Sequence, residues 1–185
     1  MCKFEEEDSL SRILIHLDLD SMWISAAFLL FALALNGVKS DSDGSFSLGR
    51  RCPIGWEKFG TQCFKYFSDL KPWAEAEKQC IDLGGNLASI PNKLSNDFLK
   101  TFVKKHAKDS TRTWIGAHDA TKAFVWFWSD GSKFEYSDWH TGEPNNGGEA
   151  ERCVEMGYGD EKRWNDAHCD TELSFICYRT ARINF

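Results

Sequence analysis

A first helix is predicted by apolar residues that recur three or four positions apart. The residues that form this stripe are Trp73, Ala76, Cys80 and Leu83. Pro72 suits the first turn of a helix, and Ser68 or Asp69 is the expected N-cap. Gly84-Gly85 marks the end of the helix.

A second helix is predicted near 92–107, because its apolar and basic residues fall on separate faces. The inner stripe consists of Leu94, Phe98, Leu99, Phe102 and Val103. The outer face carries Lys100, Lys104, Lys105 and Lys108. These lysines are expected to be solvated, and contact with an anionic surface is the alternative.

Short strands account for the remaining apolar runs. Residues 55–67 indicate two strands around a glycine turn, and Trp114-Ile115-Gly116-Ala117 indicates a buried strand. The closing strands are expected at 153–156 and 174–177. The aromatic row at 124–128 leads into a hairpin-type turn, and core packing explains it better than ligand stacking does.

The N-terminal third lacks such patterns and divides into three segments. Residues 1–21 are acid-rich with no predicted fold, which suggests an upstream extension of the reading frame. The apolar run within 22–37 is shorter than the about 20 residues that a membrane span needs, so a signal peptide cleaved within 34–40 is expected. A short membrane anchor is the alternative to secretion. Residues 38–51 form a flexible lead-in to one domain at 52–185.

Composition narrows the class of protein. The net charge is −6, and no basic run is present, which argues against a nucleic-acid partner. The seven cysteines become an even six once Cys2 leaves with the leader, as an extracellular disulfide framework requires. Spacing alone leaves all 15 pairings of six cysteines open.

Oxygen-bearing side chains gather between Glu143 and Asp166. Ca²⁺ takes about 6–8 oxygen ligands, so a few protein donors leave positions for the vicinal hydroxyls of a sugar. The five candidate donors are Glu143, Asn145, Glu151, Asn165 and Asp166. The amide NH₂ groups of Asn145 and Asn165 would be free to donate to those hydroxyls. An ordinary polar loop is the alternative for residues 142–148, and the isomer of the Glu143-Pro144 bond stays open.

The order of these motifs resembles the C-type lectin domain family. Its mannose-type signature matches Glu143-Pro144-Asn145, Glu151 and Trp164-Asn165-Asp166, and the resemblance extends from Cys52 to about Tyr178. The chain is similar to secreted, single-domain fish members of that family. The resemblance implies an α+β fold, with two helices flanking small antiparallel sheets and a long calcium-binding loop region.

The resemblance also implies disulfide pairs and a ligand set. The expected disulfides are Cys52–Cys63, Cys80–Cys177 and Cys153–Cys169. One Ca²⁺ site, shared with the sugar, would use the five donors named above. The family's auxiliary calcium positions correspond to Asp119, Ala123, Asn146 and Arg152. Because Ala123 and Arg152 supply no anionic oxygen, this second site is expected to be absent.

The expected function is calcium-dependent binding of mannose, N-acetylglucosamine or fucose, in innate recognition of microbial glycans. A homo-oligomer would provide avidity. Two alternatives share the fold: an ice-binding antifreeze protein, and a calcium-independent protein-binding domain. Catalysis is not expected, because no His-Glu-x-x-His motif and no nucleophile elbow is present in the sequence.

Overall fold

The computed structural model describes residues 51–107 and 111–181. The predicted extension, the signal peptide and the lead-in up to residue 50 lie outside these ranges, as does Lys108. Within the described ranges, no helix is long and apolar enough to cross a membrane.

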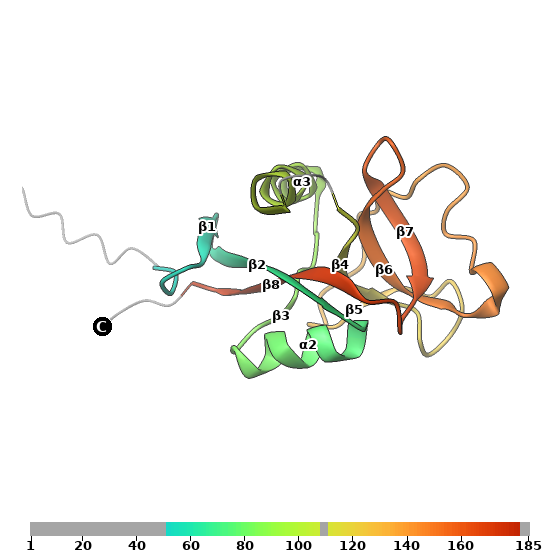
Figure 1. Ribbon diagram of the computed structural model, residues 1–185, viewed down its shortest axis with the longest axis horizontal. Helices are drawn as coiled ribbons and strands as arrows, with labels where there is room; N and C mark the ends of the chain where they lie inside the picture. Colours follow the sequence, from blue (N-terminus) through green and yellow to red (C-terminus); the bar gives the residue numbers. More distant parts are fainter. Residues whose placement is uncertain (1–50, 108–110, 182–185) are drawn as a thin grey trace, which may run out of the picture. The chain divides into compact units, whose positions relative to one another are not determined.

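Eight strands and two α-helices build the described domain (Figure 1). The strands are β1 (Glu57–Phe59), β2 (Gln62–Lys71), β3 (Asn86–Leu87), β4 (Thr113–His118), β5 (Phe127–Trp128), β6 (Glu151–Tyr158), β7 (Arg163–His168) and β8 (Leu173–Thr180). The helices are α2 (Trp73–Asp82), α3 (Lys93–Ala107) and the short 3₁₀ helix η1 (Gly147–Glu149).

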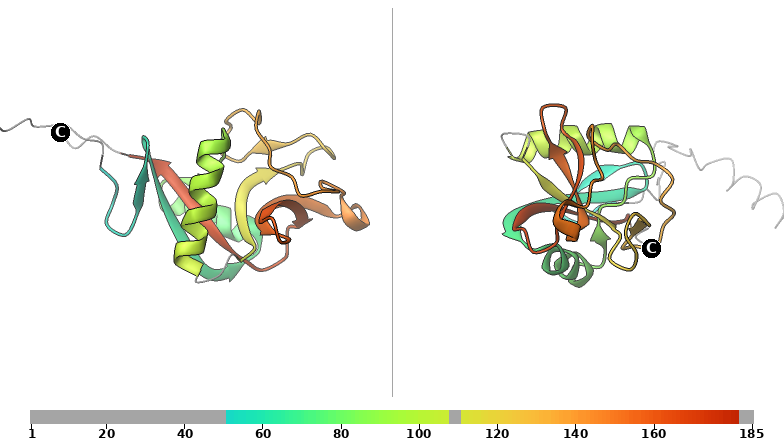
Figure 2. Two further views of the ribbon diagram at one scale, coloured as in Figure 1. Left: turned by 90° about the horizontal axis from the view of Figure 1, so that it is seen from above. Right: turned by 90° about the vertical axis from the view of Figure 1, so that its right-hand side faces the viewer.

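The strands share one hydrogen-bonded sheet in the order β1-β2-β8-β4-β6-β7, with β3 on β8 and β5 on β4. The pairs are antiparallel except β4 and β8, which run parallel. Helices α2 and α3 lie on opposite sides of the central strands (Figures 1 and 2). This arrangement confirms the predicted α+β fold with two flanking helices.

Large rings fill the core beside α3. Trp164 is fully buried, and the rings of Trp128 and Trp139 each meet it edge-on with centroids 5.8 Å away. Its indole Nε1 also donates to Asn96 Oδ1 at 3.0 Å, so the polar edge of the ring is satisfied inside the core. Trp164 is therefore a core residue that fixes the strand on which Asn165 and Asp166 lie.

Three disulfides staple the domain with the expected pairing. They are Cys52–Cys63, Cys80–Cys177 and Cys153–Cys169. The second closes 97 residues and ties α2 to β8, whereas the third closes only 16 residues between β6 and the end of β7.

The predicted start of the first helix was wrong. Ser68 and Asp69 lie in β2, which continues to Lys71 because it pairs with β8 to that point. Helix α2 begins at Trp73, and Pro72 occupies the N-cap position without a side-chain hydrogen bond. Strand pairing therefore overrode the local capping signal.

The inner stripe of the second helix was partly wrong. Leu94 is 69% exposed, while Leu99, Phe102 and Val103 are buried. Ser95 takes the core-facing position four residues before Leu99, so the first turn of α3 points Leu94 to solvent.

The aromatic row divides between core and surface. Trp128 is buried and Trp126 packs against Trp139 with centroids 4.9 Å apart, but Phe124, Val125 and Phe127 are exposed. The turn after Trp128 forms, with Gly131 N donating to Trp128 O. It does not join a hairpin, because β5 pairs with the earlier strand β4. The core interpretation therefore holds for the tryptophans alone.

Candidate functional site

The predicted site residues lie at the end of the domain far from β1 (Figures 1 and 2). Glu143 and Asn145 are in the long loop before η1, Glu151 opens β6, and Asn165 and Asp166 belong to β7. Strands β6 and β7 pair antiparallel, which brings the second and third motifs together. The Cys153–Cys169 disulfide links the same two strands.

Asp166 anchors the loop to β7. Its side chain is fully buried, and its two carboxylate oxygens accept the backbone N–H groups of Asn145 at 3.0 Å and Asn146 at 2.7 Å. The peptide bond between Glu143 and Pro144, within this loop, is cis. One carboxylate thus fixes the backbone of the loop that carries Asn145.

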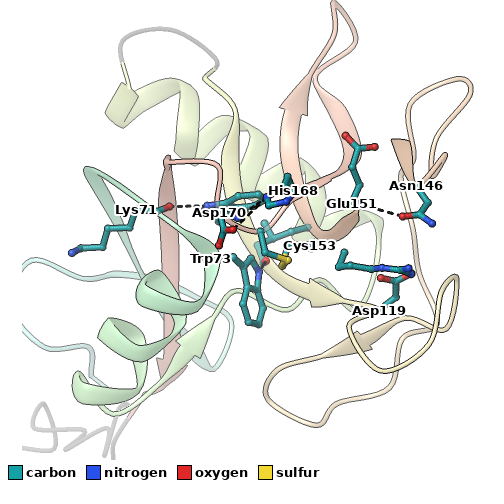
Figure 3. Close-up of a disulfide and its surroundings, with 12 residues drawn as sticks. Lys71, Trp73, Asp119, Asn146, Glu151, Cys153, His168 and Asp170 are labelled. Atoms are coloured by element: carbon teal, nitrogen blue, oxygen red, sulfur yellow. Dashed lines mark hydrogen bonds and ion pairs between the residues drawn. A yellow bond between two sulfur atoms is a disulfide. The ribbon is translucent and has the colours of Figure 1, made fainter. Parts of the chain in front are cut away.

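Glu151 and Asn145 present oxygens to the same small space. Glu151 Oε2 accepts the N–H of Gly147 at 2.7 Å, and Glu151 N donates to Asn146 Oδ1 at 3.2 Å (Figure 3). A Cβ atom added to Gly147 would lie 2.8 Å from Glu151 Oε2 and 3.2 Å from Asn145 Oδ1. The two oxygens therefore flank a position that only glycine leaves open.

Glu143 faces the other carboxylates. Burial raises its pKa above the usual value, and the nearby charges of Asp166 and Glu151 raise it further. Its Oε2 is buried and has no hydrogen-bond partner within the described ranges. A buried, unpaired oxygen among like charges is costly unless a cation or proton compensates it.

The side chain of Asn165 is held by a glutamate of β6. Its Nδ2 donates to Glu155 Oε1 at 2.8 Å, and Arg112 Nε donates to Glu155 Oε2 at 2.6 Å. Glu155 is fully buried, and burial is the main cause that raises its pKa, against the opposing effect of Arg112. One N–H of the Asn165 amide is therefore committed to Glu155, and the expectation that this NH₂ group is free was wrong.

Glu155 and Arg112 support the candidate site residue Asn165, and the sequence reasoning missed both. Residues 153–156 were assigned only to a closing strand, and that strand is correct. The available signal was a glutamate between Val154 and Met156, since an unpaired charge is rarely placed inside a buried strand.

The carboxylates fit a hard divalent cation by donor type and by charge. Within residues 51–107 and 111–181, no three His, Cys, Asp or Glu side chains stand in chelating geometry. Asp166 and Glu151 instead accept backbone N–H groups, and the amide oxygens of Asn145 and Asn165 complete the oxygen-rich set. A bound cation would compensate the buried oxygen of Glu143 that has no hydrogen-bond partner within the described ranges.

A guanidinium lies at the expected auxiliary position. Arg152 Nη1 is 3.5 Å from Asp119 Oδ2, and Asp119 is almost fully buried. The same Asp119 oxygen accepts the N–H of Phe124 at 2.6 Å. A positive side chain of the protein therefore compensates Asp119 there.

Comparison with known proteins identifies the family to which this chain belongs. The Lectin C-type domain family matches residues 69–179. Ladderlectin of Oncorhynchus mykiss is 43% identical over 119 residues, which make up 64% of this chain and 63% of ladderlectin, so the match spans less than two thirds of that relative. The galactose-specific lectin nattectin of Thalassophryne nattereri is 44% identical over 126 residues, 68% of this chain and 79% of nattectin.

Solved structures agree with the sequence match. The cow C-type carbohydrate-recognition domain of CD23, in the presence of a GlcNAc2Man3 oligosaccharide, superposes with a TM-score of 0.66 at 33% identity and covers 72% of this chain and 99% of that one. A Ca²⁺-dependent type II antifreeze protein in its Ca²⁺-free form gives 0.65 at 31% identity, with 70% and 100% covered. This chain therefore belongs to the C-type lectin domain family, whose members bind carbohydrate and are not enzymes.

Proposed function

We propose that this protein is a calcium-dependent lectin whose single Ca²⁺ site also binds the sugar. The observation that carries the proposal is one oxygen of Glu143 that is buried and unpaired within the described part of the chain, near the carboxylates of Asp166 and Glu151. A divalent cation would compensate these like charges, which otherwise raise the pKa of Glu143.

The five predicted donors have distinct roles in this proposal. The carboxylates of Glu143, Glu151 and Asp166 supply negative charge to Ca²⁺, and the amide oxygens of Asn145 and Asn165 complete the protein's share of its ligands. Bound Ca²⁺ would supply open coordination positions for two neighbouring sugar hydroxyls. Binding is reversible, and no bond in the sugar is made or broken.

The side chains also orient the sugar through hydrogen bonds. The NH₂ group of Asn145 donates to a hydroxyl, and the remaining lone pairs of Glu143 and Glu151 accept from hydroxyls. Asn165 contributes at most one N–H, because Glu155 takes the other. The sugar is therefore recognised chiefly from the side of the loop before η1.

The Glu143-Pro144-Asn145 form favours sugars with vicinal equatorial hydroxyls, such as mannose, N-acetylglucosamine and fucose. The relative CD23 was solved in the presence of a mannose-containing oligosaccharide, which supports this class. Nattectin, by contrast, is described as galactose-specific, so galactose is the competing ligand to test.

Two other functions of the fold compete with sugar binding. Likeness to a type II antifreeze protein makes ice binding the first, and thermal hysteresis of the purified protein measures it. Binding to a protein without calcium is the second. The full set of oxygen donors favours a calcium-dependent lectin over both.

We further propose an extracellular, secreted protein that recognises microbial glycans. Three disulfides suit an oxidising compartment. A site that grips two hydroxyls binds one sugar weakly, so several copies on a repetitive glycan surface would supply avidity.

The deciding experiment is retention of the oxidised protein on mannose and galactose resins. The proposal requires retention on mannose resin with Ca²⁺, elution by a chelator, and weaker retention on galactose. Retention that survives the chelator contradicts the calcium site. Stronger retention on galactose overturns the mannose-type assignment and leaves calcium dependence intact.

A further inference from the structure

A second candidate binding site lies away from the calcium loop, between α3 and the β6–β7 turn. A cavity of about 280 Å³ opens there. Helix α3 covers this side of the sheet (Figure 1). The cavity's volume is slightly below the about 300–1,000 Å³ that ligand pockets span, so it suits only a small ligand. The lining residues are Lys100, Thr101, Val103, Lys104, Met156, Gly157, Glu161 and Lys162.

The cavity combines a basic rim with an apolar floor. Val103 and Met156 are buried and form the floor from α3 and β6. Lys100 and Lys104 reach the rim from α3, and Lys162 comes from the turn between β6 and β7. Positive charge therefore approaches the same space from two separate elements.

The ion pairs between lysines and carboxylates show which lysine charges are free to bind an anion. Lys93, Lys100 and Lys105 of α3 each lie within 2.7 Å of an acidic oxygen, on Asp97, Asp138 and Glu57 respectively. Within the described ranges, neither Lys104 nor Lys162 lies within 4.0 Å of a carboxylate. Lys104 of α3 and Lys162 therefore line the same cavity, and neither has a carboxylate partner within the described ranges.

The acidic residue of the rim does not cancel this charge. Glu161 Oε2 lies 3.4 Å from Arg163 Nη1, so its negative charge already has a positive neighbour. Lysine binds tetrahedral oxyanions as a point charge, and the floor of Val103 and Met156 suits the C–H face of a small ring. The cavity therefore matches an anionic group carried on a compact organic body.

We propose that this cavity binds a sugar residue carrying a sulfate or phosphate ester, with Lys104 and Lys162 holding the oxyanion. The site needs no calcium and does not depend on the proposed lectin function. It would let the domain contact one glycan through hydroxyls at one end and through an anionic ester on the α3 side.

Titration calorimetry on the full oxidised protein in excess chelator tests the proposal. The probes are glucose-6-sulfate, glucose-6-phosphate, unmodified glucose and inorganic sulfate. We expect binding of at least one ester, weakening as salt screens the lysines, with no binding of glucose and weaker binding of inorganic sulfate. The two esters distinguish sulfate from phosphate as the natural group.

Charge-reversed and neutral variants supply the controls. Lys104→Glu with Lys162→Glu should lower the affinity by about tenfold or more, and the Gln versions should lower it less. Lys58→Glu with Lys133→Glu changes the net charge equally at exposed positions outside the cavity and should leave affinity unchanged. Unchanged affinity in the Lys104 and Lys162 variants overturns the proposal, as does equal loss in the control pair. Equal binding of inorganic sulfate and the esters also overturns it.

Discussion

The guanidinium of Arg152 lies 3.5 Å from the carboxylate of Asp119, and both residues belong to the auxiliary calcium positions that the family resemblance implied. The backbone holds the 119–124 turn against the start of β6, since Asp119 N donates to Arg152 O at 3.0 Å. The side chain of Arg152 adds a positive charge beside the buried carboxylate of Asp119.

Restoring acidic residues at the auxiliary position should create a second ion site. Ala123→Glu with Arg152→Asp supplies the two missing anionic ligands beside Asp119 and Asn146. Calorimetry should then detect two Ca²⁺ per chain in place of one. The control Arg152→Gln should remain at one ion and lose about 1–3 kcal/mol of stability, because buried Asp119 loses its counter-charge. Two ions in the unmodified protein would refute this account.

Glu155 should matter for calcium although it is fully buried behind the site. Glu155→Gln leaves one side-chain oxygen for two donors, Arg112 Nε and Asn165 Nδ2, so the amide of Asn165 is no longer held in one orientation. We expect Ca²⁺ affinity to fall by about 10–100-fold, the usual loss when a residue that orients a metal ligand is replaced. Calorimetry with Ca²⁺ measures this loss.

Two controls separate orientation of Asn165 from general damage. Glu149→Gln removes an exposed charge close to the same loop and should leave Ca²⁺ affinity unchanged. Glu155→Asp keeps the charge and should recover part of the affinity. If Glu155→Gln binds Ca²⁺ as tightly as the unmodified protein, Glu155 has no positioning role.

Sugar preference should follow the loop sequence. Glu143→Gln with Asn145→Asp exchanges which residue carries the carboxylate and which the amide, so the hydrogen-bond pattern around the sugar hydroxyls is inverted. Preference for mannose over galactose should change by about tenfold or more, equivalent to ~1.4 kcal/mol. Competition on mannan-coated plates measures the ratio. An unchanged ratio, with Ca²⁺ affinity retained, would place specificity elsewhere.

The effect of pH on stability should reverse sign with calcium. Burial and the nearby Asp166 and Glu151 carboxylates raise the pKa of Glu143 in the folded domain. A carboxyl group with a raised pKa stabilises the fold while protonated, and this contribution is lost as pH rises through the folded pKa. In chelator, the unmodified protein should therefore lose stability relative to Glu143→Gln as pH rises above about 4.5.

Calcium should reverse which of these two proteins is the more stable, because the ion compensates the charged form of Glu143. With Ca²⁺ present, the unmodified protein should be the more stable of the two near neutral pH and should lose the advantage, and its mannan binding, on acidification. Thermal unfolding of both proteins from about pH 4 to about pH 8 measures the difference. Parallel curves in chelator would contradict the pKa assignment.

Removing Cys80–Cys177 should mainly lower stability, whereas removing Cys153–Cys169 should also weaken Ca²⁺ binding. Replacing Cys80 and Cys177 by serine opens a link across 97 residues and should cost about 4–5 kcal/mol with little change in Ca²⁺ affinity once folded. Replacing Cys153 and Cys169 should cost nearer ~3 kcal/mol but weaken Ca²⁺ binding more, because that link joins the two strands of the site. Equal effects on calcium would argue against this division.

Much of the fold was predictable from the sequence, because strong local patterns agreed with the tertiary structure. The helix ending at Gly84-Gly85 and the buried strand at Trp114 are examples. The N-cap was wrongly predicted at Ser68 or Asp69, since pairing with β8 extends β2 past both residues. The exposure of Phe124 was also hidden, because an aromatic residue in sequence carries no information about which face its turn presents.

The candidate site was predicted as a set of donors but not as a network. The motifs identified Glu143, Asn145, Glu151 and the pair 165–166 because each carries oxygen at a recognisable spacing. The support for Asn165 was missed because Arg112 and Glu155 are 43 residues apart and meet only when β4 pairs with β6. Such long-range partners leave no periodic signal along the chain.

Gly147 sets a limit on how this loop can vary. Any side chain there would begin within 3.2 Å of the oxygens of both Glu151 and Asn145, so even alanine would push two proposed ligands apart. Ala150 is exposed and has a negative φ, so no comparable contact restricts it. The bare backbone at one residue is thus as much a part of the proposed cage as the acids around it, and a library that randomises the loop for new sugars should hold that one position fixed.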